Sequence, residues 1–393
     1  MAAVITQLQE FLNHLHELIF KDDADFYDLL TIACAWAVFW AVFFPIATPL
    51  LRKVTYGKPW LRAGSERELE RFGGAKAASE AFGADLTEEQ CIEWLMSNWA
   101  AEKVMITQHA VGGALCIPSM LGLLDPSRAS SLAVLGILCE IGWEIEHIIV
   151  DVIYARLRHG AERVPNGMII GSLIHHSLAS GLGIPVILRY RQWWVIHSLC
   201  FDLQLGPGFV TPIAEWGKLL DISKPNDLRQ FKICNIIKLI LFGWTRGIHF
   251  IYLVAHALIG WYNDKAWAYM IGGAPALLAF TWFNYSSILR PTLKTYMKFR
   301  NASAEYEALP KDAPEKQKLA SRANLEDIAR ELIEETEIID PADRLATLIE
   351  SFRGEKKIIE RRQTMPPLQT LTSMRSMRLT RGFSVPPRAW KMD

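Results

Sequence analysis

The chain has 393 residues, its 42 Lys and Arg are balanced by 42 Asp and Glu, and 51% of its residues are hydrophobic. Several stretches of roughly 20 residues contain almost no Lys or Arg, and a helix of that length crosses a bilayer core of about 30 Å. This pattern excludes a soluble enzyme, a disordered protein and a nucleic-acid binder, since nucleic acid requires a basic surface. We predict an all-α, polytopic membrane protein.

The first segment, 1–27, is predicted to be amphipathic. It is polar except at helically spaced apolar positions, which is typical of a helix that lies in the membrane interface. These positions are Val4, Leu8, Phe11, Leu12, Leu15 and Ile19.

Seven membrane-spanning helices are predicted to follow. The first, with its basic flank, occupies 28–62, and 63–98 form a cytosolic loop with a lead-in helix that starts at the capping-box pattern Thr87-Glu-Glu-Gln90. The main membrane domain, 95–300, contains the other six spans. The seven spans lie at about 28–51, 99–124, 131–154, 168–188, 192–212, 232–260 and 267–289.

The basic residues predict the orientation. Lys and Arg cluster after spans one, three, five and seven, whereas the opposite loops carry Arg128, Lys265 and one exception, Arg189 with Arg191. Because cytosolic loops are enriched in Lys and Arg, the N-terminus is predicted to face the lumen or the exterior and the C-terminus the cytosol.

The C-terminal part is predicted to have two regions. Residues 301–362 form a charged helical tail, and apolar positions repeated every three or four residues in 311–362 predict packing on a partner protein or a second copy of the chain. Residues 363–393 form a basic disordered end, either solvated or resting on anionic lipid.

Span three carries acids on one face. At about 100° per residue, Glu140, Glu144, His147, Asp151 and Tyr154 share this face. An acid at a helix centre costs about 2.5–3.5 kcal/mol on insertion scales, so neighbouring helices must supply partners or some acids must be protonated. Such a stripe is either a functional site or an interhelical hydrogen-bonded seam.

Span four carries the pair His175 and His176. Imidazole serves as base, nucleophile or metal ligand near neutral pH. Ser172, Ala179 and Gly183 share the His176 face, so that a neighbouring helix or a lipid chain could approach closely. The other spans add His109, His197, Asp202, Gln204, Arg246, His249 and Asn284, with Arg246 predicted as a counter-charge for the acids of span three.

Two chemistries compete for these residues. Glu144-x-x-His147 has the spacing of di-iron carboxylate bundles, but the spans hold no second copy, so we predict no metal site. Acyl transfer needs a base or nucleophile, an orienting acid and an apolar slot. His175 and His176 supply the first, and Asp151, Glu144 or Asp202 the second.

The order of these features resembles the TLC domain family, which includes the ceramide synthases and smaller TLC-domain proteins. The resemblance covers about 95–300. It rests on ITQHAVGG (106–113), IGWEIEHIIVD (141–151), LIHHSLASG (173–181), FDLQLGPGFVTP (201–212) and FNYSSILRPTLKTYMKF (283–299).

The resemblance implies a membrane bundle around a lipid-holding cavity, in the endoplasmic reticulum or a related membrane. In ceramide synthases the paired His, with acids on a nearby helix, serve acyl transfer from acyl-CoA to a sphingoid base, and His175 and His176 inherit that role by position. The chain departs from the family in span five, where His197 and Asp202 are separated and Gln204-Leu-Gly-Pro-Gly replaces Glu-Leu-Ser-Thr-Pro.

The leading hypothesis is a TLC-like protein that binds lipid acyl chains and transfers one to a sphingoid or other amine-bearing lipid, with acyl-CoA as co-substrate and no bound cofactor. The catalytic candidates are His175, His176, Asp151, Glu144 and Asp202. The lipid-binding candidates are His109, Ser172, Ala179, Gly183, His147, Arg246 and Asn284. The alternatives are a non-catalytic sensor of membrane lipids and, less favoured because no internal repeat is seen, a proton-coupled transporter.

Overall fold

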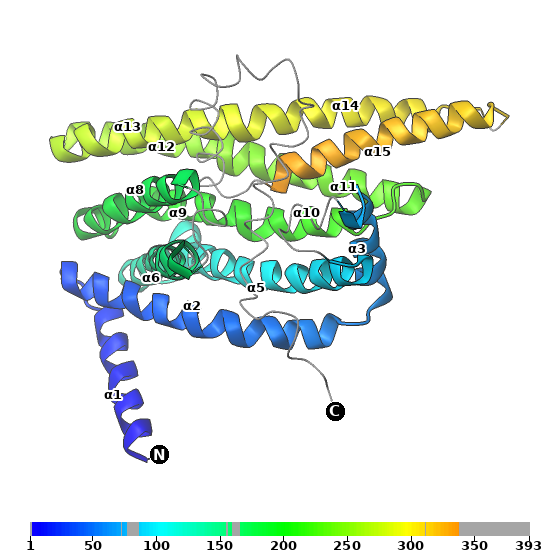
Figure 1. Ribbon diagram of the computed structural model, residues 1–393. Helices are drawn as coiled ribbons and strands as arrows, with labels where there is room; N and C mark the ends of the chain where they lie inside the picture. The colour runs from blue at the N-terminus through cyan, green and yellow to red at the C-terminus, as the bar shows by residue number, and fades with distance from the viewer. Residues whose placement is uncertain are drawn as a thin grey trace. The chain divides into compact units, whose positions relative to one another are not determined.

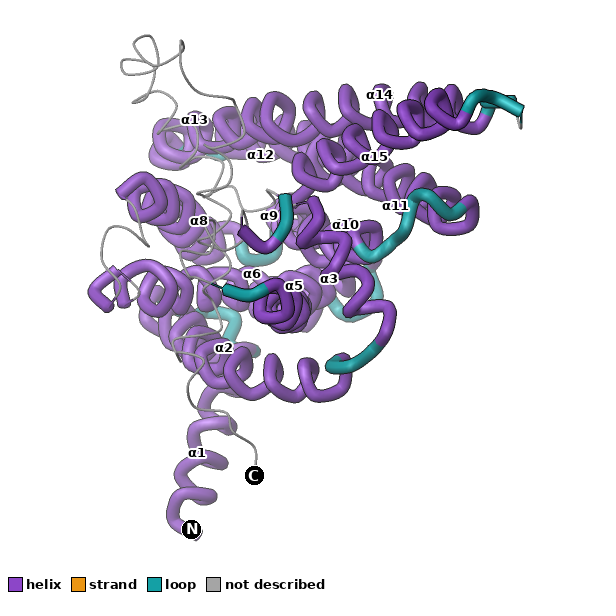
Figure 2. Tube along the Cα trace, turned by 45° about the vertical axis from the view of Figure 1, so that its right-hand side comes forward, coloured by secondary structure: helices purple, strands orange, loops and turns teal. Residues whose placement is uncertain are grey.

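The structure is a computed structural model that describes residues 2–71, 73–76, 86–154, 156–158, 166–310 and 312–337. Throughout these residues the regular elements are helices, and none is a strand (Figure 2). The prediction of an all-α fold is therefore confirmed.

The helices follow the predicted spans closely (Figure 1). Spans one, two and four fall on single helices, and the other four fall on unbroken runs in which an α-helix continues through a π-helical segment. In chain order the helices are α1 (Ala2–Ile19), α2 (Phe26–Thr55), α3 (Pro59–Arg71), α5 (Glu88–Leu121), α6 with η1 (Pro126–His147, Ile148–Tyr154), α8 (Asn166–Tyr190), α9 with η2 and α10 (Trp194–Leu205, Gly206–Val210, Thr211–Lys218), α11 with η3 and α12 (Pro225–Phe242, Gly243–Ile248, His249–Asn263), α13 with η4 and α14 (Trp267–Phe283, Asn284–Leu289, Arg290–Glu307), and α15 (Glu315–Glu337).

Three of these helices are long and apolar enough to cross a membrane, as far as the chain is described. They are Phe26–Thr55, Glu88–Leu121 and the run Pro225–Asn263, which match predicted spans one, two and six. The full count of seven spans and the orientation of the termini stay predictions.

The chain forms two compact units. Unit 1 comprises 1–40, 106–146 and 174–339, and unit 2 comprises 41–105, 147–173 and 340–393. Several helices begin in one unit and end in the other, as α2 and α5 do.

In unit 1, the last turn of α1 packs into an apolar core with the start of α2, α6 and α8. Leu18, Leu29, Leu138 and Ile187 are buried there. The helix predicted over 4–20 is confirmed by α1. Leu18 anchors the last turn of α1 against the start of α2 (Figure 1). Its position at the membrane interface stays a prediction.

Arg191 lies in a loop on the predicted non-cytosolic side, where few Lys and Arg residues are expected. Its contacts give it a structural role there. Its Nη2 donates to Ile19 O, at the end of α1, at 2.9 Å and to Ser131 Oγ at 3.2 Å. Burial lowers the pKa of its guanidinium below the usual value. Since Arg191 ties α1 to α6, its charge is explained by packing.

A second core of unit 1 joins the loop after α10 with α11, α14 and α15. Leu325, Ala329 and Leu332 of α15 are buried against Phe231 and Phe299. α15 lies along α14 (Figure 1), and Lys298 Nζ contacts Glu331 Oε1 at 2.7 Å.

Within the tail, α15 (Glu315–Glu337) packs on its own chain, and the charged helical tail expected over 301–362 stays a prediction. α14 continues through the expected boundary at 300/301 to Glu307. Contact with a partner protein or a second copy through 311–362 stays a prediction, and the disordered end expected at 363–393 lies outside the described residues.

Unit 2 confirms the predicted capping box. Thr87 N donates to Gln90 Oε1 at 2.9 Å and Gln90 N donates to Thr87 Oγ1 at 3.3 Å, which satisfies two amides at the start of α5. Arg62 of α3 binds both carboxylate oxygens of Glu89, at 2.8 and 2.6 Å, and so holds α3 against α5.

Candidate functional site

Glycines bring the helix backbones of unit 1 close together around the polar residues. A Cβ on Gly136 of α6 would lie 2.5 Å from Gly112 O of α5. Gln204 of α9 fills the remaining space, and its Nε2 donates to Gly136 O at 3.1 Å. Because α5 and α6 approach closely and the Gln204 side chain of α9 packs against both, the buried polar groups beside them have little room to move.

Three residues of α6 and α8 form what we call the Glu144 cluster: Glu144, His176 and Ser180. Glu144 Oε1 lies 3.7 Å from His176 Nδ1, and Ser180 Oγ donates to Glu144 Oε2 at 3.1 Å. His176 is fully buried and Glu144 is 1% exposed. The cluster brings the acid stripe of span three against the second His of the pair.

A second His–carboxylate pair lies one helical turn away on α6. His109 Nδ1 of α5 lies 3.1 Å from Glu140 Oε2, with the proton on Nδ1 because a carboxylate only accepts. The Trp143 ring meets both histidines edge-on, with centroid distances of 5.4 Å to His109 and 5.8 Å to His176. Glu140 and Glu144 thus receive partners from neighbouring helices, as the insertion cost requires.

Asp202 of α9 and His249 of α12, with Arg246 of η3, form what we call the Asp202 cluster. His249 Nδ1 donates to Asp202 Oδ2 at 2.8 Å, and Asp202 is fully buried. Arg246 Nη2 donates to Leu203 O at 2.8 Å, and its charge interacts with Asp202 and with Glu140. The pairing of Arg246 with an acid of span three stays a prediction, and the nearer opposite charge is that of Asp202.

Three π-helical segments, η2, η3 and η4, adjoin the Asp202 cluster. η3 contacts both α9 and η4, and a Cβ on Gly247 of η3 would lie 3.1 Å from Leu289 Cδ1 of η4. A Cβ on Gly206 of η2 would lie 3.2 Å from Arg246 Nε, so glycine leaves room for the guanidinium. Single π turns within α-helices are frequent at functional sites, because they redirect the side chains that follow.

Other predicted residues have different surroundings. His197 donates from Nε2 to Arg191 O at 2.7 Å and accepts at Nδ1 from Ser119 Oγ at 2.6 Å, so both nitrogens serve structure. At Gly183 a Cβ would lie 3.0 Å from Ile141 Cδ1, so α6 occupies the space beside it.

Two more predicted lipid-binding residues are buried. His147 belongs to unit 2, and Asn284, at the start of η4, has an Nδ2 that finds no hydrogen-bond partner within the described ranges. The side chains of Asp151, Ser172, His175 and Ala179 lie outside the described residues.

Three polar residues of unit 1 were not among the predicted site residues. Ser180 follows His176 by four positions, and this spacing could have placed it on the same helix face. Lys238 interrupts the apolar run of α11 and is 2% exposed, and Glu215 of α10 is 4% exposed. Burial of both charges marks a polar interior that hydropathy alone underestimates.

No group of three or more His, Cys, Asp or Glu side chains stands in position to hold a metal ion, within the part of the chain that is described. A shallow surface depression between α1, α2 and α6 is lined by residues such as Leu29, Val134 and Arg191, and it has no room for a water molecule. The lipid-holding cavity that the family resemblance implies stays a prediction.

Replacing Asp202 by Ala is expected to lower the free energy of unfolding by about 2 kcal/mol, because His249 loses its charged acceptor and buried Arg246 loses a nearby opposite charge. Asp202→Asn, which keeps an acceptor for His249 but removes the charge, is expected to cost less. Thermal unfolding in detergent measures both variants. Equal stability of Asp202→Ala and the wild type would contradict this role.

No protein-family model matches the sequence, and no curated protein or solved structure matches it either.

Proposed function

We propose that the chain is a seven-span membrane protein of TLC type that binds lipid acyl chains and transfers an acyl group from acyl-CoA to a sphingoid or other amine-bearing lipid. The observation that carries the proposal is the contact between Glu144 and His176. These residues are 32 positions apart and belong to the acid stripe and the His pair, two of the five segments on which the resemblance to the TLC domain family rests.

In this mechanism Glu144 is a positioning residue. Ser180 donates to one carboxylate oxygen, and the other lies 3.7 Å from His176 Nδ1, which is beyond hydrogen-bond distance. In the proposal, the charge of this carboxylate favours the proton of the neutral imidazole at Nδ1. His176 Nε2 is then the acceptor for a proton from the attacking amine.

The reaction balances with this single base. The amine nitrogen attacks the thioester carbonyl, the C–N bond forms and the C–S bond breaks. His176 takes the proton from nitrogen and returns it to the departing CoA thiolate. His175, the other His of the pair, is the alternative base.

The remaining candidates have supporting roles in the proposal. His109 and Glu140, beside Trp143, would border the space next to the Glu144 cluster. The membrane would be the endoplasmic reticulum or a related one, with the N-terminus lumenal and the C-terminus cytosolic. Acyl-CoA would then reach span four from the cytosol, and a second copy or partner protein would bind through 311–362.

The test uses purified protein in lipid nanodiscs with a long-chain acyl-CoA and a sphingoid base, and detects the N-acyl product by mass spectrometry. We expect product with the wild type and none with the double variant His175→Ala/His176→Ala. Bound lipid without turnover would replace the proposal by the lipid sensor. Proton flux in liposomes without lipid conversion would replace it by the transporter.

A further inference from the structure

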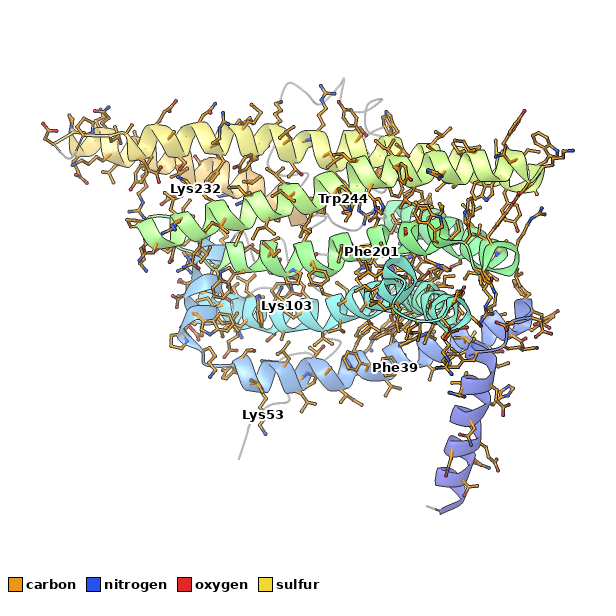
Figure 3. The ribbon with its side chains drawn as sticks, turned by 180° about the vertical axis from the view of Figure 1, so that it is seen from behind. Phe39, Lys53, Lys103, Phe201, Lys232 and Trp244 are labelled. Atoms are coloured by element: carbon orange, nitrogen blue, oxygen red, sulfur yellow. The ribbon has the colours of Figure 1, made fainter. Side chains whose placement is uncertain are left out.

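An aromatic face lies beside the Asp202 cluster, on the outside of η3 and α12. The His249 ring is nearly parallel to the Trp244 ring, with centroids 5.1 Å apart, and to the Tyr252 ring, with centroids 6.4 Å apart. Trp244 is 51% exposed and Tyr252 is 49% exposed. Figure 3 labels Trp244 on this run and Phe201 on α9, the helix that also carries Asp202.

These contacts leave one polar atom of His249 for a ligand. Trp244 and Tyr252 lie alongside the ring, and Nδ1 is bonded to Asp202 Oδ2. The His249 side chain is still 16% exposed. With the proton held on Nδ1, Nε2 of the neutral ring is a hydrogen-bond acceptor.

The charges next to His249 favour a neutral ligand over a cation. The buried carboxylate of Asp202 and the buried guanidinium of Arg246 have opposite signs and interact with each other. Asp202 is fully buried, so the partly exposed ring of His249 is the group of this pair that a ligand can reach. An acceptor with no net negative charge around it, such as His249 Nε2, can accept a hydrogen bond from a neutral hydroxyl group.

The surroundings of the face suit an apolar body on that hydroxyl. Ile240, Ile248 and Ile251 on the same run are 66, 71 and 51% exposed. The run Pro225–Asn263 is long and apolar enough to cross a membrane, so such side chains would face lipid. A polar ring system within that apolar surface marks the position of a headgroup, not of an acyl chain.

We propose that Asp202, His249, Trp244 and Tyr252 form a binding site for a long-chain lipid alcohol, with the hydroxyl donating to His249 Nε2 and the chain lying along η3 and α12. The site is separate from the Glu144 cluster. It does not depend on acyl transfer, and it gives the Asp202–His249 pair a role outside the reaction.

The test uses the full chain in nanodiscs with a photoreactive, alkyne-bearing long-chain primary alcohol as the probe. After irradiation, mass spectrometry quantifies labelling of peptides within 243–263. The matched probe is the methyl ether of the same alcohol, which lacks the donor. We expect the alcohol to label this segment about five times more than the ether, as the loss of one hydrogen bond predicts.

The variant His249→Phe keeps an aromatic ring and removes the acceptor. We expect it to reduce alcohol labelling to the level of the ether, while His14→Phe, at an exposed His on α1, leaves labelling unchanged. Equal labelling of the wild type by alcohol and ether would overturn the proposal, and this comparison needs no variant that might misfold. Loss of labelling in His14→Phe to the same extent as in His249→Phe would also overturn it.

Discussion

The variant His176→Ala is expected to lower the rate constant of acyl transfer by about 1,000-fold, within the range for loss of a general base. The reason is chemical, because no other group of the Glu144 cluster accepts a proton from an amine as imidazole does. Steady-state kinetics with varied sphingoid base give kcat and KM separately. His14→Ala, an exposed His on α1, is the control and should retain the wild-type rate.

Glu144→Gln separates positioning from packing in the same cluster. The amide keeps the size of the side chain and can still accept from Ser180, but it loses the charge that faces His176 Nδ1. We expect kcat to fall about 100-fold with KM little changed, since the interaction is needed in the transition state. A variant that lost stability instead of kcat would assign Glu144 a structural role.

Replacing Gly142 by Leu is expected to lower the free energy of unfolding by about 3 kcal/mol or more, as strong overpacking does. A Cβ on Gly142 of α6 would lie 2.4 Å from Trp36 Cβ and 2.6 Å from Ala33 O of α2. Backbone atoms cannot rotate away, so α2 and α6 must separate and expose the core around Leu29 and Leu138.

The measurement is thermal unfolding in detergent, followed by size-exclusion chromatography. Gly142→Ala should give a smaller loss in the same direction, because it adds only the Cβ that meets Trp36 and Ala33 and no further side-chain atoms. Gly272→Ala of α13 is the matched control, since nothing lies within 4 Å of its added Cβ. An unchanged unfolding temperature for Gly142→Leu would mean that α2 and α6 do not pack as described.

Much of the fold could be predicted from local patterns. The capping box at Thr87 and Gln90, the helix over 4–20 and the helical repeat of the tail depend only on residues within one or two turns. The number of spans could not be settled in this way. Buried charges such as Lys238 and Glu215 lower the hydropathy of helices whose polar faces are satisfied inside the bundle.

The candidate site was predictable in part. Helical spacing put Glu140 and Glu144 on one face, and both have His partners on other helices. The same reasoning offered Asp202 as an alternative acid for the His pair, but Asp202 binds His249. Nothing in the spacing within a single span tells which histidine of another span will face a given acid.

The sequence by itself determined that the chain is helical, where its helices run and which polar residues share a helix face, since period and hydropathy are local properties. Only the tertiary structure decided the partners: Glu144 with His176, Asp202 with His249, and His197 with Ser119. Partner choice depends on how each helix is rotated about its axis. Each extra residue in a π turn changes that rotation by about 100°, so η2 and η3 redirect every side chain that follows them.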